Sequence, residues 1–506
     1  MKSYASSAEI RSYLKAVTCH YEIDRYISLR SAVTRTVWSE TESKWTVSVQ
    51  NQGDFDCEIL VNACGILNNV QYPRVKDLDL FQGPLLHTAA WDDNVDLSGK
   101  RVAIIGAGAS AIQTLPAIAE TVERCDVYIR TPSWISPPFG TDKPGNFTYT
   151  EEEKQRFRDD PDFSLSTRKA METSFNNLYS ASVKGSEEQV ALRNALEKSM
   201  KALIRDPELH DKLIPKFEVG CRRVNPGERY LTALQLPNVH PVFEPIDSVT
   251  PEGVVCGGQL REVDAIITAT GFDTSFRPRF PIIGRNGRDL RDLWRDDPVG
   301  YFGLAVSGFP NYLVFLGPNT PISNGSLMGT LEATVEYFIR LFKKFMHEKA
   351  VSFDIREEVQ ADFDAHTQDT MKQMVWTGPC RSWFKSEDGK VRALWPGSSL
   401  HYREVLESNR WEDFKWGYRG NRFAHWGLGR ATVEFESEKT RDLAYYFEKH
   451  KPLPLEAYYL AAIGNDARVA IGDSFRKSGE GGEEGKVVLE DDDEDTLVNT
   501  PEVVGI

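Results

Sequence analysis

The pattern of apolar and polar positions is clearest around Lys100, where short apolar runs alternate with a helical repeat. Arg101–Ile105 is an apolar, partly β-branched run, which predicts a parallel strand covered on both faces. Ser110–Glu120 has apolar residues at helical spacing, and Asp126–Ile129 predicts a second strand. Val263–Phe272 predicts a further buried strand. We therefore expect an α/β fold built on a parallel sheet.

The N-terminal part is expected to be one helix followed by strands. Met1–Tyr21 has Ile10, Tyr13, Leu14 and Val17 at the spacing of an amphipathic helix. No G-x-G-x-x-G sequence precedes the strands, so the chain is expected to begin partway into a domain. The expected strands are Tyr26–Leu29, Ala32–Trp38, Trp45–Val49 and a buried one at Glu58–Ala63.

Helical patterns return in two later stretches. Thr150–Lys216 is rich in Glu, Lys, Arg and Ala, which predicts a helical insertion that either caps a cleft or forms a solvated hairpin. Phe309–Asn319 predicts a strand running into a turn. Gly479–Ile506 is Gly- and acid-rich with almost no aromatic residues, so it is expected to be disordered. A long helix is expected at Thr330–Met346, with a packing face of Leu331, Val335, Phe338, Leu341 and Phe342.

A glycine-rich turn follows the first buried strand. Gly106, Gly108 and Ala111 have the G-x-G-x-x-A spacing. The first glycine allows a tight turn, the second lets a pyrophosphate approach the backbone, and the small third residue lets helix and strand pack closely. An ordinary Gly-rich turn is the alternative, but the flanking strands and helix favour a dinucleotide site. Its expected contacts are Gly106, Ala107, Gly108, Ala109, Ser110, Ala111, Ile112 and Gln113.

The residues after the second strand indicate which dinucleotide binds. NAD sites usually have an acid there to hold the ribose 2′-hydroxyl, whereas a cation accommodates a 2′-phosphate. This chain has Arg130 and Thr131 at that point and no acid. A guanidinium and a hydroxyl suit a phosphate dianion, so NADPH is favoured over the alternative of a solvated arginine.

Composition limits the remaining possibilities. The 506 residues are 41% apolar and 27% charged, which is ample for two or three domains. A net charge of −15 without basic runs argues against nucleic-acid binding. No apolar run is long enough to span a bilayer, and no signal-peptide pattern is present, so a soluble, cytoplasmic protein is expected. No metal site and only reduced thiols are expected from Cys19, Cys57, Cys64, Cys125, Cys221, Cys256 and Cys380.

A second motif lies directly before the glycine turn. Phe81, Gly83, His87, Trp91 and Asp92 occupy the fixed positions of F-x-G-x-x-x-H-x-x-x-W-D. This pattern resembles the fingerprint of the Baeyer–Villiger monooxygenases, which are class B flavoproteins. In that family the motif is thought to link the two nucleotide-binding domains, so the resemblance indicates the family and not a catalytic role. Taken alone, the histidine and tryptophan would be ordinary packing residues.

Further residues resemble the same family. Cys221–Val224 is similar to the family's K-R-L segment, and the resemblance assigns Arg223 to the active-site arginine that lies over the flavin and stabilises negative charge. Arginine suits this role because it stays protonated. Arg222 matches the family lysine that helps bind the 2′-phosphate, and Val33 matches a backbone contact to FAD. Without the flanking similarity, the arginines would be interpreted as a surface cluster and Val33 as an ordinary strand residue.

The resemblance implies a Rossmann-like, two-dinucleotide-binding-domain flavoprotein fold with a helical insertion, in which the first FAD half is missing. Ala269–Asp273 and Val61–Gly65 resemble the two points where the family's chain crosses between domains. The implied domains are 1–98, a remnant of the FAD-binding domain; 99–270, the NADP-binding domain with its insertion at about 150–216; 271–465, the return to the FAD domain and the substrate-side region; and 466–506, an acidic disordered tail.

The activity implied by the resemblance is oxidation of a small-molecule ketone to an ester or lactone with NADPH, FAD and molecular oxygen, in fungal polyketide or terpenoid metabolism. N- or S-oxygenation is the alternative chemistry. The missing FAD motif leaves three interpretations open: a sequence that starts at an internal methionine, a shortened relative without flavin redox chemistry, or a non-catalytic NADP-binding protein. Arg130, Arg223 and the complete fingerprint favour the first. Trp383 or Trp395 either shapes a substrate pocket or belongs to the core.

Overall fold

A computed structural model describes residues 2–138, 146–323 and 325–447 of the chain. The chain divides into two compact units, Met1–His425 and Trp426–Ile506, and each is considered by itself. The described part of the second unit includes a short 3₁₀ helix at Thr432–Phe435. The sites discussed below belong to the first unit.

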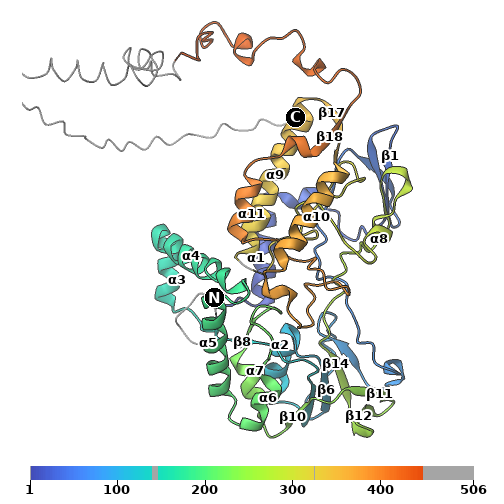
Figure 1. The fold of residues 1–506 in the computed structure, drawn as a ribbon, viewed down its shortest axis with the longest axis vertical. Coiled ribbons are helices and arrows are strands. Elements are labelled where there is room, and N and C mark those ends of the chain that lie inside the picture. Colours follow the sequence, from blue (N-terminus) through green and yellow to red (C-terminus); the bar gives the residue numbers. More distant parts are fainter. Residues whose placement is uncertain (1, 139–145, 324, 448–506) are drawn as a thin grey trace, which may run out of the picture. The chain divides into compact units, whose positions relative to one another are not determined.

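A five-stranded parallel sheet carries the glycine-rich turn (Figure 1). Its central strands are almost wholly buried, because their apolar runs are covered on both faces as the pattern predicted. Neighbouring strands all pair in parallel. The order is β10 (Val239–Val242), β7 (Arg124–Tyr128), β6 (Arg101–Ile105), β14 (Ala265–Thr268) and β5 (Leu85–His87).

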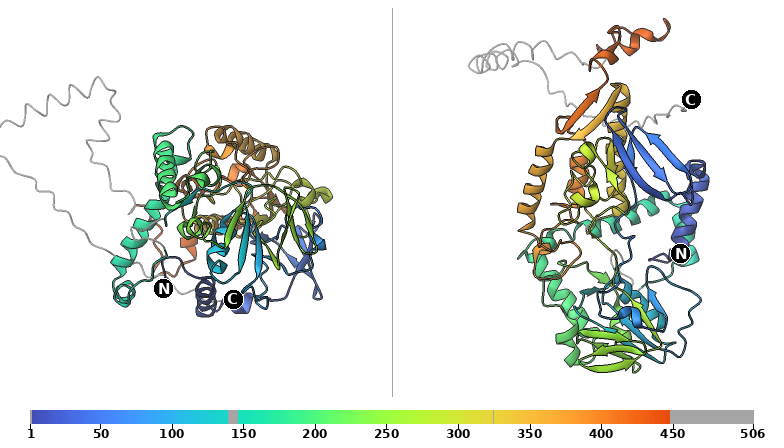
Figure 2. Two further views of the ribbon diagram at one scale, coloured as in Figure 1. Left: turned by 90° about the horizontal axis from the view of Figure 1, so that it is seen from below. Right: turned by 90° about the vertical axis from the view of Figure 1, so that its right-hand side faces the viewer.

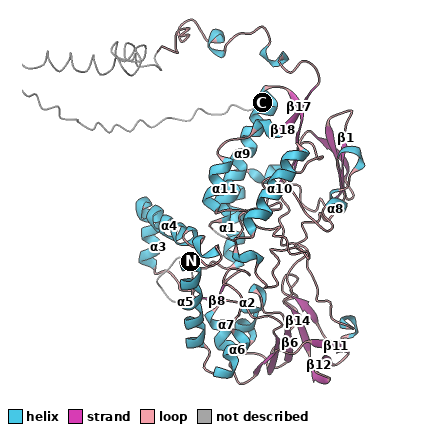
Figure 3. Cartoon of the chain, viewed as in Figure 1, coloured by secondary structure: helices cyan, strands magenta, loops and turns pink. Residues whose placement is uncertain are grey.

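Helices pack against this sheet to form the largest core of the described chain (Figure 3). Helix α2 (Ala109–Ile118) follows β6 directly and packs beside α7 (Glu228–Ala233). Ala111 is completely buried, so helix and strand approach closely, as the small third residue of the motif predicted. The predicted strand–turn–helix–strand unit is confirmed, with its ends shifted by one or two residues.

Arg101 and Asp264 join the beginnings of β6 and β14. The backbone N–H and Nε of Arg101 donate to Oδ2 of Asp264 at 2.8 and 3.2 Å, and Nη2 donates to Oδ1 at 2.9 Å. These hydrogen bonds from the guanidinium and the backbone lower the pKa of Asp264 to about 2. Asp264 follows a three-stranded antiparallel sheet of β11 (Ile246–Thr250), β12 (Gly253–Cys256) and β13 (Gln259–Glu262).

We expect Asp264→Asn to destabilise the protein near neutral pH and to lose that effect in acid. The folded-state pKa of Asp264 lies below the ordinary value of 3.8, so its contribution is present above that value and disappears as the pH falls towards 2. The side chain is 36% exposed, and solvent screening therefore reduces the contribution to about 1 kcal/mol. Urea unfolding of variant and wild type at about pH 6 and about pH 3 measures this. A difference in unfolding free energy that does not shrink in acid would contradict the prediction.

Three N-terminal strands, drawn in blue in Figure 2, and one later strand form a separate four-stranded sheet. Trp45 is fully buried there, and its Nε1 donates to the carbonyl of Pro310 at 2.8 Å. The chain therefore leaves this region before the five-stranded sheet and returns to it afterwards. The sheet order is β15 (Ile282–Ile283), β1 (Val33–Ser39), β2 (Lys44–Val49) and β3 (Gly53–Cys57), and β4 (Leu60–Asn62) pairs in parallel with β16 (Tyr312–Val314) nearby.

The stretch from Thr150 to Lys216 is helical, as its composition predicted. Thr150 caps the first helix, and its hydroxyl accepts the backbone N–H of Glu153. Whether this insertion caps a substrate cleft stays a prediction. Its helices are α3 (Glu151–Asp159), α4 (Pro161–Asn176), α5 (Glu187–Leu203) and α6 (His210–Leu213).

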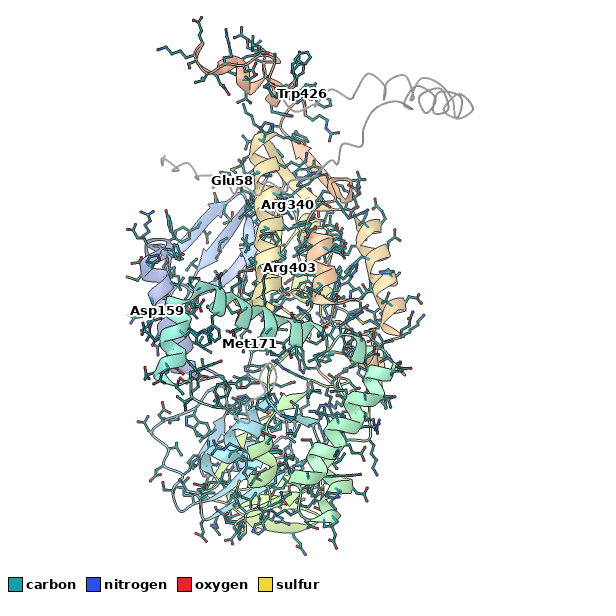
Figure 4. The ribbon with its side chains drawn as sticks, turned by 90° about the vertical axis from the view of Figure 1, so that its left-hand side faces the viewer. Glu58, Asp159, Met171, Arg340, Arg403 and Trp426 are labelled. Atoms are coloured by element: carbon teal, nitrogen blue, oxygen red, sulfur yellow. A yellow bond between two sulfur atoms is a disulfide. The ribbon has the colours of Figure 1, made fainter. Side chains whose placement is uncertain are left out.

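The C-terminal half of the first unit packs around a long helix, α9 (Leu327–His347). Helix α11 (Ser399–Leu406) lies beside it, and the two labelled arginines of Figure 4 anchor this contact. Arg403 donates to the carbonyl of Gly329 at 2.7 Å, and Arg340 donates to Oδ1 of Asn409 at 2.8 Å. The remaining elements are α8 (Leu290–Leu293), β17 (Ala350–Ile355), α10 (Glu357–Met371) and β18 (Phe414–Tyr418).

Several local predictions were wrong. Tyr26–Leu29 is not a strand, because a 3₁₀ helix at Ile23–Tyr26 precedes irregular chain there. The strand predicted at Glu58–Ala63 is the short β4, which is partly exposed and not buried. The polar strand β3 was not predicted, since its Asp-rich sequence lacks apolar alternation.

The predicted helix faces also needed correction. The N-terminal helix α1 (Ser7–His20) forms, but it has no buried residue, and Tyr13 and Leu14 are well exposed. In α9 the buried face is rotated to include Thr330, Thr334 and Tyr337, whereas the predicted Val335 is exposed. A helix that packs on several neighbours can bury small polar residues that the simple apolar stripe leaves out.

No helix among the described residues has the length and apolarity needed to cross a membrane. The tail predicted to be disordered, 479–506, lies outside the described residues. The predicted domain boundaries stay predictions.

Candidate dinucleotide-binding site

The glycine-rich turn connects β6 to α2. Gly106 has a φ of +129°, and a Cβ there would lie 2.4 Å from the carbonyl oxygen of Ala269. Both the backbone conformation and this neighbour therefore require glycine. Gly108 is the N-cap of α2 with an extended backbone, and a Cβ there would meet nothing within 4 Å. Open space beside this backbone is what the approach of a pyrophosphate requires.

The beginning of α2 presents N–H groups without partners. No side chain caps this helix, and the amides of Ala107 and Gly108 donate to no described residue. The turn itself is fixed, because Ser133 Oγ donates to the carbonyl of Ala107 at 2.7 Å and the Gly106 N–H donates to the carbonyl of Tyr128 at 3.2 Å. Free N–H groups and the helix dipole both favour an anion. The turn therefore fits a pyrophosphate.

The expected contacts at 106–113 all lie in this turn and the first turns of α2. The side chains of these residues differ in whether a ligand can reach them. Ala111 and Ile112 are buried against the sheet, so only their backbone can face a ligand. Gln113 is exposed, and its Nε2 donates to the carbonyl of Ala109 at 3.0 Å.

Arg130 and Arg222 lie together just beyond the end of β7. Nη1 of Arg222 donates to the carbonyls of Thr131 and Pro132 at 3.3 and 3.4 Å, so the structure brings the three residues predicted for the 2′-phosphate into one place. Burial lowers the pKa of Arg222, and the neighbouring Arg130 lowers it further. Neither arginine forms a salt bridge with any residue that the structure describes. Two close cations without a carboxylate are suited to an anionic ligand.

Arg223 follows Arg222 directly in the chain, but it does not share the contacts of Arg222 with the segment after β7. Its side chain is exposed and forms no salt bridge with the described residues. Its backbone is fixed, because Asn225 Nδ2 donates to the Arg223 carbonyl at 3.0 Å and β9 (Asn225–Pro226) pairs with β8 (Ile135–Ser136). Arg223 is thus a free guanidinium on an anchored segment.

The structure corrects the expectation that all seven cysteines are reduced thiols. Cys221 and Cys380 form a disulfide with a Cα–Cα distance of 6.2 Å across 159 residues of sequence. Because the two cysteines are so far apart in the chain, no local sequence pattern indicates that they pair. Each of them directly precedes an arginine. The other cysteines are free: Cys19, Cys57, Cys64, Cys125 and Cys256.

The histidine of the second motif lies buried at the end of β5. The Ala89 N–H donates to Nδ1 of His87 at 3.1 Å, which assigns the ring proton to Nε2. Burial lowers the pKa of His87, so the ring is neutral. It packs between Tyr72 and Phe272, with ring centroids 5.4 and 6.3 Å away. Tyr72 belongs to the segment that enters the five-stranded sheet and Phe272 to the segment that leaves it. His87 therefore packs between the two segments that connect this sheet to the rest of the first unit.

A recess lies at the carboxyl ends of β4 and β16, where ligands bind in parallel sheets. Asn62 orders one wall, since its Oδ1 accepts the Cys64 N–H at 3.0 Å and its Nδ2 donates to the Tyr312 hydroxyl at 3.0 Å. Among the described residues, no glycine turn like that of β6 follows β1 or β4. The lining includes Cys64, Gly65, Phe276, Trp294, Phe315 and Gly317.

Three other predicted residues lie away from the glycine turn. Val33 is the first residue of β1, in the N-terminal sheet, and it does not line this recess. Trp395 is buried in the core, where it stacks on Phe363. Trp383 is half-buried beside Phe384. The core interpretation therefore holds for Trp395.

The fold is that of an α/β protein, with a glycine turn and two arginines whose geometry suits a phosphorylated dinucleotide. Comparison with known proteins identifies a matching family and similar proteins. The family described as "Flavin-binding monooxygenase-like" matches residues 2–178. The FAD-binding monooxygenase stcW of Emericella nidulans is 37% identical, over 92% of this chain and 79% of its own length. A Baeyer–Villiger monooxygenase of Pseudomonas aeruginosa is 33% identical, over 80% of this chain and 76% of its own.

Solved structures agree with these relatives. Cyclohexanone monooxygenase from Rhodococcus sp. Phi1 bound to NADP⁺ is 26% identical, with a TM-score of 0.72, over 82% of this chain and 86% of that one. The chain therefore belongs to the family of FAD-binding, Baeyer–Villiger-type monooxygenases and has their two-dinucleotide-binding-domain fold.

Proposed function

We propose that the protein uses NADPH, FAD and molecular oxygen to convert a small ketone to an ester or lactone. The observation that carries the proposal is the pair Arg130 and Arg222, which lie without carboxylate partners in the same site as the uncapped beginning of α2. Family membership supplies the reaction type, and the fungal FAD-binding relative supports a substrate from secondary metabolism.

The NADPH site is assigned to the glycine turn and the arginines. The free amides of Ala107 and Gly108 would hold the pyrophosphate, since no side chain competes for them. Arg130, Thr131 and Arg222 would hold the 2′-phosphate, because their charges and hydroxyl match a dianion. Selection of NADPH over NADH follows from these residues.

The flavin is assigned to the recess at the ends of β4 and β16. Its walls combine an ordered asparagine, glycines and aromatic rings with the charged residues Asp273, Arg277 and Arg279, and we assign the polar flavin ring system to it. When bound, FAD supplies the two-electron and oxygen chemistry of this enzyme class. The fit is confined to the ring, because the described residues provide no second glycine turn for the FAD pyrophosphate. The Val33 backbone contact to FAD stays a prediction.

Arg223 is assigned to the reacting centre. Its guanidinium forms no salt bridge with the described residues and lies on a backbone held by Asn225. Fixed N–H donors of this kind stabilise negative charge that develops on oxygen when a ketone is attacked. His87 is given no proton-transfer role, because it is buried, neutral and packed between two segments.

The visible absorbance spectrum of the purified chain, with and without added FAD, tests the proposal. After unbound FAD has been removed, a retained oxidised-flavin spectrum that NADPH bleaches and air restores is the expected result. NADH in place of NADPH is the control, and it should bleach the flavin far more slowly because Arg130 and Arg222 select the 2′-phosphate. A protein that stays colourless with added FAD would overturn the monooxygenase assignment for this chain.

Product identity separates the two candidate chemistries. The complete F-x-G-x-x-x-H-x-x-x-W-D motif favours oxygen insertion beside a ketone over N- or S-oxygenation. A cyclic ketone and an aryl methyl sulfide, each supplied with NADPH and air, are suitable probes. A lactone from the ketone at a higher rate than sulfoxide from the sulfide is expected, and the reverse order would favour the second chemistry.

A further inference from the structure

A third arginine joins Arg130 and Arg222 from a distant part of the chain. Arg381 is exposed and lies close enough to Arg130 for its charge to lower the pKa of that residue, after the larger effect of burial. Arg381 also forms no salt bridge with the described residues. None of these three guanidinium groups forms a salt bridge with a described carboxylate; the buried carboxylate of Glu218 lies beside the disulfide of this region.

A covalent bond places this third arginine. Cys380 precedes Arg381, Cys221 precedes Arg222, and the two cysteines form the buried disulfide of this chain. The backbone amides of residues 380–383 donate no hydrogen bond to the described residues, whereas Phe384 and Trp383 pack in a core cluster just after Arg381. The segment runs close to the disulfide, since a Cβ on Gly378 would lie 3.2 Å from Sγ of Cys221. The disulfide is therefore a direct covalent link between the residue before Arg381 and the residue before Arg222.

We infer that Arg381 is a further ligand of the NADPH 2′-phosphate and that the Cys221–Cys380 disulfide is the element that positions it. This inference rests on the proposed NADPH site and adds a residue and a redox dependence to it. Three clustered cations repel one another, so the cluster is stabilised by a dianion that contacts all of them. Arg381 then adds affinity for a 2′-phosphate and none for a dinucleotide that lacks one.

The same arrangement makes the site sensitive to loss of the disulfide, although both sulfurs are buried and a thiol must first reach them. A dithiol such as dithiothreitol gives two electrons and two protons, the S–S bond breaks, and two thiols form on Cys221 and Cys380 while the reagent becomes a cyclic disulfide. Arg381 is then released from its fixed position, and affinity for the 2′-phosphate falls. Because binding linkage is reciprocal, a bound 2′-phosphate also protects the disulfide against reduction.

Calorimetric titration of the purified chain with adenosine 2′,5′-bisphosphate tests the first half of the inference, and adenosine 5′-monophosphate is the control ligand. Neither ligand needs flavin or turnover. Arg381→Gln should weaken binding of the bisphosphate about tenfold or more and leave the monophosphate unchanged, since one charged contact to phosphate is lost. The matched control Arg419→Gln, which removes an exposed charge from the segment after β18, should change neither affinity.

The second half is tested with Cys380→Ser and with wild-type protein reduced by dithiothreitol. Both should lose affinity for the bisphosphate in the wild-type background and lose little more in the Arg381→Gln background, because the disulfide acts through Arg381. Thermal unfolding monitors whether the variants stay folded, and reduction of wild type gives the same readout without a substitution.

The outcomes separate this inference from the proposed function. If wild-type protein binds no bisphosphate, the NADPH site itself is wrong and Arg381 has no role in it. If wild type binds and Arg381→Gln binds equally well, the NADPH site stands and the third ligand is wrong. If Arg381→Gln weakens binding but neither Cys380→Ser nor reduction verified by a thiol count does, the disulfide is not the positioning element.

Discussion

Arg223→Ala is expected to abolish most product formation while leaving the dinucleotide site intact. Loss of a fixed donor to a developing oxyanion costs about 100- to 1,000-fold in rate. The Arg223 side chain makes no salt bridge with the described residues, and the backbone there is held by Asn225, so its removal leaves no buried charge unpaired. The measurement is ester or lactone formed per NADPH consumed, followed alongside calorimetric binding of adenosine 2′,5′-bisphosphate.

Two comparisons sharpen this prediction. Arg223→Lys keeps the charge but loses the planar set of donors, so partial activity is expected. Arg222→Gln should show the opposite behaviour, with weaker binding of the bisphosphate and a smaller change in product formed at saturating NADPH. Unchanged product formation in Arg223→Ala would remove this residue from the reacting centre.

Gly106→Ala is expected to destabilise the sheet region and to abolish dinucleotide binding. A Cβ at this position would lie 2.4 Å from the carbonyl oxygen of Ala269, and the φ of +129° is unsuited to alanine. Strain and overpacking together should cost about 2–4 kcal/mol of unfolding free energy. Urea unfolding measures the stability, and titration with NADP⁺ measures the binding.

Gly108→Ala is the matched control for that experiment. Its Cβ would meet nothing within 4 Å, and its backbone is extended, so the fold should be kept. The added methyl group would occupy the space reserved for the pyrophosphate, so binding of NADP⁺ should weaken without loss of stability. If both variants lose stability equally, the second glycine is needed for the turn and not for a ligand.

The unit β6–α2–β7 could be predicted because every signal for it is local. An apolar run, two glycines and a helical repeat stand next to one another, and Arg130 follows at the end of the second strand. Arg222 could be added only through the family resemblance, since nothing in its own neighbourhood says that it contacts the chain after β7. A residue that stands next to a motif can be identified from the sequence, whereas a partner from a distant part of the chain can be identified only once the fold is known.

The sequence did not reveal features that depend on distant packing. The Cys221–Cys380 disulfide joins segments 159 residues apart. The recess at β4 and β16 is formed where two short strands 250 residues apart in the chain meet. Helix α1 has the expected periodicity, yet no described residue buries its apolar face. Periodicity predicts that a helix forms, but it does not say what covers the helix.

The strand order of the five-stranded sheet has a consequence for synthesis on the ribosome. β5 and β6 are consecutive in the chain, but β14 lies between them in the sheet. The nascent chain must therefore keep a gap open while the helical segment 150–216 and the hairpins β11–β13 emerge. Open strand edges of this kind invite wrong pairings, and late, long-range pairing is slow. A chain that ends before Ala265 would thus have β6, β7 and β10 but lack β14, the neighbour on the other side of the strand that carries the glycine turn.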